Sequence, residues 1–268
     1  SSKKYNIEKL IFLNCTFEDS IILDNIDFPG HIAFLGCHFK NNLVLNDINT
    51  KNLTLLGNEF DKDVYLTAKY NDNYIHDFLF ALNHLDNFYF EGSNIYINCP
   101  YAGKIELFDI AIISNSVNKI VISGITNNNN FFSWYNIARE ISYNSVFSNG
   151  FIGFKYNFFG TLELKNQLKN DKVNFGLSHN IIEKMTIDNY FLSFFLMTQN
   201  KVNHIDISSF RAYSYFGIRD NVYSDHAKII FHDCDTYKFN FENKKDTIYT
   251  LEPDTLNPAS FDKSAPRL

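Results

Sequence analysis

The chain has 268 residues, 45% of them hydrophobic, and its 30 acidic and 24 basic side chains give a formal net charge of −6. This balance argues against a nucleic-acid partner, which would require clustered Lys and Arg. The apolar runs are too short to span a bilayer, and the four cysteines form no Cys-x-x-Cys pair or disulfide framework. We therefore expect a soluble protein in a reducing, cytoplasmic setting, with a secreted mature form as the alternative.

Residues 1–9 precede any repeat and are expected to form an N-terminal cap. A six-residue pattern then appears as Phe12–Phe17 (FLNCTF) and returns as Phe34–Phe39 (FLGCHF) and Leu55–Phe60 (LLGNEF). The Cys or Asn in this pattern recurs every 20 to 25 residues, with one longer step of 32 residues. We call these residues the markers: Cys15, Cys37, Asn58, Asn83, Asn115, Asn136, Asn157, Asn180, Asn200 and Asn221.

Apolar residues flank the markers with a period of two, which is typical of short strands rather than helices. Around Asn157, for example, Ile152, Phe154 and Phe159 are expected to point inward. Because the same set recurs about every 21 residues, each repeat predicts one coil of a solenoid that stacks on the next coil. The predicted fold is all-β: a right-handed parallel β-helix of about ten coils of 20–25 residues, with one longer coil, over residues 10–241.

The marker column is interpreted as structural. Asn tolerates the tight corner between two strands, and stacked amides form hydrogen bonds from coil to coil as a ladder. Cys15 and Cys37 replace Asn in the first two coils as small buried residues that lie one above the other. Free thiols are the expectation at these two positions, and a disulfide between them is the alternative.

The first three repeats resemble the pentapeptide-repeat family, whose coils carry a small residue two places before an inward Phe or Leu. The resemblance rests on Cys15-Thr-Phe17, Cys37-His-Phe39 and Asn58-Glu-Phe60 and covers about 60 residues. Some members of that family are elongated dimers that imitate DNA. The strict five-residue period fails in this chain, so no functional residue is transferred.

Two neighbouring coils are longer than the rest, and their extra residues are expected to project as loops. The candidate loop residues are Tyr70, Tyr74, His76, Tyr96 and Tyr101. Insertions of this kind often lie on the binding side of a repeat protein, although simple variation of loop length is the alternative. After Phe241 the repeat stops, so residues 242–268 are expected to form a C-terminal tail, cap or linker.

The outward positions beside the markers show no pattern for catalysis, a metal or a cofactor, because no carboxylate stands two or four residues before any marker. Instead, the column two residues before each marker is apolar in the first six coils and becomes polar at Lys155. A contiguous apolar surface predicts a covered face. The candidate interaction face is Leu13, Leu35, Leu56, Ile113 and Trp134.

These features favour a non-enzymatic scaffold or a recognition or inhibitor subunit, which uses the apolar face and projecting loops to bind another protein or a second copy. No cofactor and no nucleic-acid partner are expected. The alternative is a β-helix protein that binds or cleaves carbohydrate, which exposed tyrosines such as Tyr135 and Tyr156 would suit. A second alternative is a DNA mimic, which would need an acidic stripe.

Overall fold

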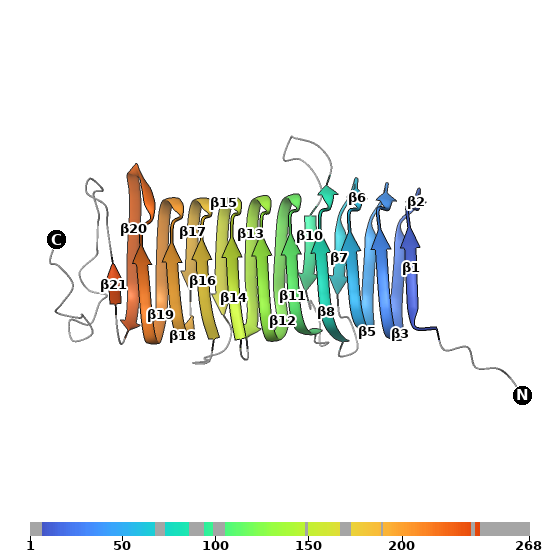
Figure 1. Ribbon diagram of the computed structural model, residues 1–268, viewed down its shortest axis with the longest axis horizontal. Coiled ribbons are helices and arrows are strands. Elements are labelled where there is room, and N and C mark those ends of the chain that lie inside the picture. The colour runs from blue at the N-terminus through green and yellow to red at the C-terminus, as the bar shows by residue number, and fades with distance from the viewer. Residues whose placement is uncertain are drawn as a thin grey trace, which may run out of the picture.

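A computed structural model describes residues 7–67, 73–85, 94–98, 105–147, 150–166, 173–188, 190–236 and 239–241. These residues form a parallel β-solenoid, in which successive coils lie side by side along one axis and the N-terminal and C-terminal coils lie at opposite ends (Figure 1). The predicted fold class is confirmed. About eight full turns are present in the described residues, slightly fewer than the ten expected from counting every marker as one coil.

One row of strands leads into the markers, and we call it the pre-marker row. Each of its strands ends two residues before a marker, and neighbouring strands pair in register; for example, Leu35 pairs with Leu13 on one side and Leu56 on the other. The strands are β1 (Lys9–Leu13), β3 (Ile21–Leu35), β5 (Leu43–Leu56), β8 (Asn73–Ala81), β11 (Ile105–Ile113), β12 (Ser116–Trp134), β14 (Gly150–Lys155), β16 (Val173–Ser178), β18 (Phe191–Thr198) and β19 (Lys201–Arg219).

The second row, the post-marker row, begins directly after the markers. Its strands are β2 (Thr16–Phe17), β4 (His38–Phe39), β6 (Glu59–Phe60), β9 (His84–Leu85), the start of β12, β13 (Ile137–Phe147), β15 (Phe158–Asn166), β17 (Ile181–Asp188), the start of β19, and β20 (Val222–Thr236). In the early coils, the first halves of β3 and β5 together with β7 (Val64–Thr67) and β10 (Asn94–Asn98) continue this side, and β21 (Phe239–Phe241) stacks on the end of β19.

The core lies between these rows and consists of the alternate inward side chains. Ile152, Phe154 and Phe159 are each at most 1% exposed, and the same positions are buried in the neighbouring coils. Phenylalanine rings stack from coil to coil, as in Phe39 on Phe60 with centroids 4.8 Å apart. Because each ring is enclosed by the coils before and after it, the core is continuous along the rod.

The markers from Asn58 to Asn221 form a buried amide ladder. At Asn157, Oδ1 accepts the backbone N–H of Asn136 at 2.9 Å and its Nδ2 at 3.1 Å. Asn157 Nδ2 donates to the Ser133 carbonyl at 2.7 Å and to Asn180 Oδ1 at 2.9 Å. The same four bonds recur at each interior coil, so every buried amide in the ladder has its partners.

The tight corner itself is formed by a different residue from the one expected. The residue before each marker, not the marker, adopts the left-handed conformation, with φ of 51° at Asn14, 61° at Gly36 and 57° at Tyr135. Turning the chain at this position aims the following amide into the corner. Asn at the marker is therefore required for its hydrogen bonds rather than for its backbone tolerance.

The ladder ends in thiols at the N-terminal coils. Cys37 Sγ donates to the Phe12 carbonyl at 3.4 Å, and Cys15 Sγ to the Leu13 carbonyl at 3.5 Å. Cys15, Cys37 and Cys234 are free thiols, whereas Cys99 lies outside the described residues. Burial is the main cause that raises the pKa of the Cys37 thiol, so this thiol stays protonated at neutral pH.

Candidate functional site on the outer sheet face

The structure aligns the predicted interaction face as one outward row along the pre-marker strands. Leu13, Leu35 and Leu56 occupy successive coils. The small Ala81, which is 5% exposed, separates Leu56 from Ile113, and Ile113 is followed by Trp134 and Lys155. Leu13 is 62% exposed, while the other four predicted residues are half-buried. The row therefore faces outward without standing fully in solvent.

The projecting loops require a correction. Tyr74 and His76 belong to strand β8, and Tyr96 belongs to β10, where it pairs with residues in both neighbouring coils. Alternating apolar residues such as Ile75, which is fully buried, belong to these strands. The backbone of β8 pairs with β5 on one side and with β11 on the other. Tyr70 and Tyr101 lie outside the described residues.

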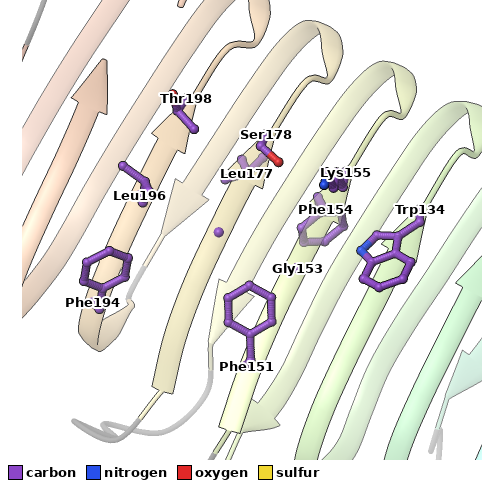
Figure 2. Close-up of a pocket in the computed structure, with 11 residues that line it drawn as sticks. Trp134, Phe151, Gly153, Phe154, Lys155, Leu177, Ser178, Phe194, Leu196 and Thr198 are labelled. Carbon is purple, nitrogen blue, oxygen red and sulfur yellow. The ribbon is translucent and has the colours of Figure 1, made fainter. Parts of the chain in front are cut away.

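A pocket of about 270 Å³ lies on the same face, at the point where the apolar row gives way to polar residues. Figure 2 shows Phe151 and Phe194 along one side, Trp134 at one end, and Lys155, Ser178 and Thr198 along the opposite rim. The side chains come from β12, β14, β16 and β18, four successive strands of the pre-marker row.

Glycines form the floor of this pocket because aromatic rings lie over them. A Cβ atom at Gly153 would lie 2.5 Å from Cε1 of Phe151, and one at Gly176 would lie 3.0 Å from Cζ of the same ring. Tyr215 lies over Gly217 in the same way, at 2.4 Å. Because glycine has no side chain, the rings can lie along the sheet at these positions, and Phe151 is still 37% exposed.

The columns two and four residues before the markers do not reveal this arrangement, because Phe151, Phe194 and Tyr215 stand six residues before their markers. A usable signal was present. An aromatic residue two places before glycine occurs at Phe151-Ile-Gly153 and again at Tyr215-Phe-Gly217. Residues two apart on a strand share one face, so a ring followed by glycine indicates a ring that can lie on the sheet.

A second apolar surface wraps around the ladder corner next to the pocket. Tyr135 stacks on Tyr156 with centroids 4.9 Å apart, and Tyr156 contacts the His179 ring at 4.7 Å. In the adjoining column Ile137, Phe158 and Ile181 are 42–46% exposed. We call Tyr135, Ile137, Tyr156, Phe158 and Ile181 the corner patch.

Charge is sparse around the pocket. Lys155 is the single ionisable side chain among the eleven lining residues, and its Nζ lies 4.9 Å from the centroid of the Tyr156 ring. The post-marker face of the same coils is polar, with Lys119 paired to Glu140 at 2.6 Å and Lys165 to Asp188 at 3.4 Å. Among the described residues of these coils, the exposed large apolar side chains therefore lie on the pre-marker face and at the corner.

One group of side chains has the types and spacing that could hold a metal ion. His38 Nε2 lies 2.9 Å from Asp61 Oδ1, and Glu59 Oε2 lies 4.0 Å from His38 Nδ1, with all ligand atoms within 4.8 Å of one another. The group is partly exposed, and its hydrogen bond accounts for its geometry. A more open hollow of about 560 Å³ beside Pro29 and Lys51 has mixed lining.

No protein-family model matches the sequence, and no curated protein or solved structure is significantly similar to it. The resemblance of the first coils to pentapeptide-repeat proteins thus gains no support from a family match. The described part of the chain contains no helix long and apolar enough to cross a membrane.

Proposed function

We propose that this protein is a non-enzymatic binding scaffold whose outer sheet face docks another protein. The observation that carries the proposal is the continuity of three apolar features: the outward row ending at Trp134, the pocket beside it, and the corner patch. Trp134 belongs to the row and lines the pocket, and it directly precedes Tyr135 of the corner patch. Contiguous exposed apolar surface of this kind marks binding sites in soluble proteins.

The pocket suits an apolar anchor side chain of the partner. Interfaces concentrate their free energy where a large side chain fills a well-packed pocket. Burying one Leu or Phe side chain in such a pocket contributes roughly 1.5–3 kcal/mol. The rigid solenoid keeps the aromatic walls in place before binding, which reduces the entropic cost of association.

The chemistry of the lining supports binding rather than catalysis. General acid–base catalysis needs titratable groups that face the same reacting atoms. Here the lining offers one ammonium group, Lys155, and two hydroxyls, Ser178 and Thr198. These groups suit hydrogen bonds to the rim of a bound partner.

Affinity capture from the native host tests the proposal when wild type is compared with matched variants. Leu35→Asp with Leu56→Asp places charge on the outward row, and Trp134→Ala with Phe194→Ala opens the pocket. Thr186→Lys, on the polar post-marker face, is the control because it adds a charge at an outward position that lies between Glu163 and Asp206 of the neighbouring coils. A partner that the control retains and both face variants lose supports the proposal, provided that all variants keep the wild-type melting transition.

Two outcomes would contradict the proposal. One is that every captured protein binds both face variants as well as wild type. The other is that sedimentation finds a homodimer that the face variants dissociate, because the surface would then serve self-association.

A second candidate function is carbohydrate binding without cleavage, which the glycine floor favours. Phe151 lies along the sheet over Gly153 and Gly176 and exposes part of its ring, which suits stacking against the C–H face of a pyranose. Trp134 is the single tryptophan of the chain, so its fluorescence reports on this pocket alone. Saturable changes with soluble oligosaccharides that Phe151→Ala abolishes would support this function over protein docking.

A further inference from the structure

The pocket at Trp134 has an apolar side and a polar rim that lie apart along the strands. Aromatic rings lie along one side, and the rim on the opposite side is the row two residues before the markers (Figure 2). Gly176, four residues before its marker, forms the floor between them. A ligand that fills the pocket therefore contacts apolar surface and touches the rim at one end. The rim consists of Lys155, Ser178 and Thr198.

Lys155 is the charged group of this rim, and within the described residues no carboxylate forms an ion pair with it. Its Nζ lies 4.9 Å from the centroid of the Tyr156 ring, a contact that holds the ammonium group beside the pocket. By contrast, Lys119 and Lys165 on the post-marker face are each paired with a carboxylate. The positive charge of Lys155 is therefore available to a ligand.

The rest of the row adds two hydroxyls and a second cation. Ser178 and Thr198 follow Lys155, and Arg219 pairs with Thr198 one coil further on. The exposed carboxylate of Asp220 directly follows Arg219, at the end of the row away from Lys155. The part of the rim beside Lys155 therefore offers a positive charge and hydroxyl donors, which suits an anionic acceptor.

A partner that fills the pocket also covers part of this rim. An ammonium group that loses its water without gaining an acceptor weakens binding, so a wholly apolar partner surface is disfavoured over Lys155. A carboxylate offsets this loss through a charge-assisted hydrogen bond to Nζ. The hydroxyl of Ser178, in the next coil of the row, can donate to the same carboxylate.

The step from floor to rim determines where this carboxylate stands in the partner. Gly176 and Ser178 are two residues apart on β16. In any extended segment, residues two apart point to the same face and are separated by about 7 Å. An apolar side chain over Gly176 and a carboxylate two residues away therefore reach the floor and the rim together.

We propose that the pocket binds an extended segment of the partner in which a large apolar residue stands two positions from an Asp or Glu. The apolar side chain lies over Gly176 beside the rings of Phe151 and Phe194, and the carboxylate accepts hydrogen bonds from Lys155 and Ser178. This inference rests on the proposed function and specifies the chemistry of the partner's anchor.

Selection from a library of random short peptides displayed on phage tests the motif, with the full chain as bait. Phage that also bind the double variant Trp134→Ala with Phe194→Ala are removed, so that the remaining peptides depend on the pocket. These peptides should carry Asp or Glu two positions from Leu, Phe or Trp. A fluorescent copy of one such peptide and its Asp→Asn or Glu→Gln counterpart then serve as probes for anisotropy.

Matched lysine variants locate the charge. Wild type should bind the acidic probe about tenfold more tightly than the amide probe, the effect of one charge-assisted hydrogen bond. Lys155→Met should bind the two probes equally, and it should keep the fold because the same row holds leucine in the first coils. Lys184→Met, at an exposed position of the post-marker face, should keep the wild-type preference. Lys155→Glu should prefer a probe with Lys in place of the acidic residue.

Three results would overturn the inference. One is a set of enriched peptides without an acidic residue at this spacing, and another is Lys155→Met that still prefers the acidic probe. The third is a selection that enriches no pocket-dependent peptide, because the pocket then binds no extended segment. The capture experiment separates these failures from failure of the proposed function: a partner that the face variants lose would show that docking is right and that only its chemistry is wrong.

Discussion

Two columns that stand two residues apart in every coil behave differently along the rod. The marker column is Asn in every coil from Asn58 to Asn221 and makes the same hydrogen bonds each time. The outward column changes from leucine in the first coils to Trp134 and then to Lys155, Ser178 and Thr198. The two columns share one backbone geometry, so the difference comes from what surrounds each side chain.

A marker is enclosed by the coils before and after it, and its neighbours are the same at every step. An amide that lost its partners there would leave buried polar groups unpaired, at a cost of about 1–3 kcal/mol each. An outward side chain has neighbours only within its sheet. Its identity is less constrained by the fold, so the change at Lys155 fits the proposed binding face, whereas the constancy of the ladder follows from stability alone.

The largest effect that would test this contrast is expected from the inward rings. Phe154→Ala or Phe175→Ala removes a side chain that is 1% exposed and leaves a cavity between coils. The free energy of unfolding should fall by about 3–5 kcal/mol, measured by urea denaturation. Phe158→Ala is the control, because Phe158 is 42% exposed on the next column and should cost well under half as much. Equal losses for Phe154 and Phe158 would mean that the inward and outward columns are not distinct.

A smaller loss is expected from the ladder. Asn157→Leu or Asn180→Leu removes four hydrogen bonds and leaves their former partners unpaired, including the Ser133 or Phe154 carbonyl. We expect the free energy of unfolding to fall by roughly 1–3 kcal/mol. Gln199→Leu changes the exposed residue that precedes a marker and keeps its left-handed backbone, so it should change stability by much less. Unchanged melting of both Asn variants would show that the ladder does not stabilise the fold.

The repeat explains why so much of the fold was readable from the sequence. The markers and their inward neighbours recur with the same spacing in coil after coil. Counting residues back from each marker is therefore enough to place Leu13, Leu35 and Leu56 in register. The corner conformation was assigned to the wrong residue because Asn suits both roles, and only the φ angles separate them.

The site was less predictable because it lies where the repeat varies. The outward direction of Trp134 follows from the register, but the pocket depends on Phe151 lying over Gly153 and Gly176, which are side-chain conformations rather than periods. Tyr74 and Tyr96 failed as loop residues because coil length shows how many residues are extra and not which ones leave the sheet. The sequence repeat predicts the solenoid and its register, whereas the pocket and the path of the longer coils require the three-dimensional structure.

The smallest expected effect concerns a buried polar group outside the ladder. Tyr190 is 1% exposed, and its hydroxyl has no hydrogen-bond partner among the described residues. Burial first, and then the nearby Tyr143, raise the pKa of this phenol well above that of an exposed tyrosine. Tyr190→Phe removes the hydroxyl and keeps the ring against Phe175, whose centroid is 6.0 Å away, so stability at pH 7 should be unchanged or higher by about 1 kcal/mol.

The same substitution should also change how stability depends on pH. Because the unfolded chain releases the Tyr190 hydroxyl proton near pH 10 while the folded chain retains it, wild-type stability should fall as the pH rises above about 10. The variant should lack that part of the decline. Urea unfolding at pH 7 and pH 10.5 measures both effects. A variant that loses more than about 1 kcal/mol at pH 7 would show that the hydroxyl is hydrogen-bonded after all, and that the ladder is not the only place where this solenoid satisfies a buried polar side chain.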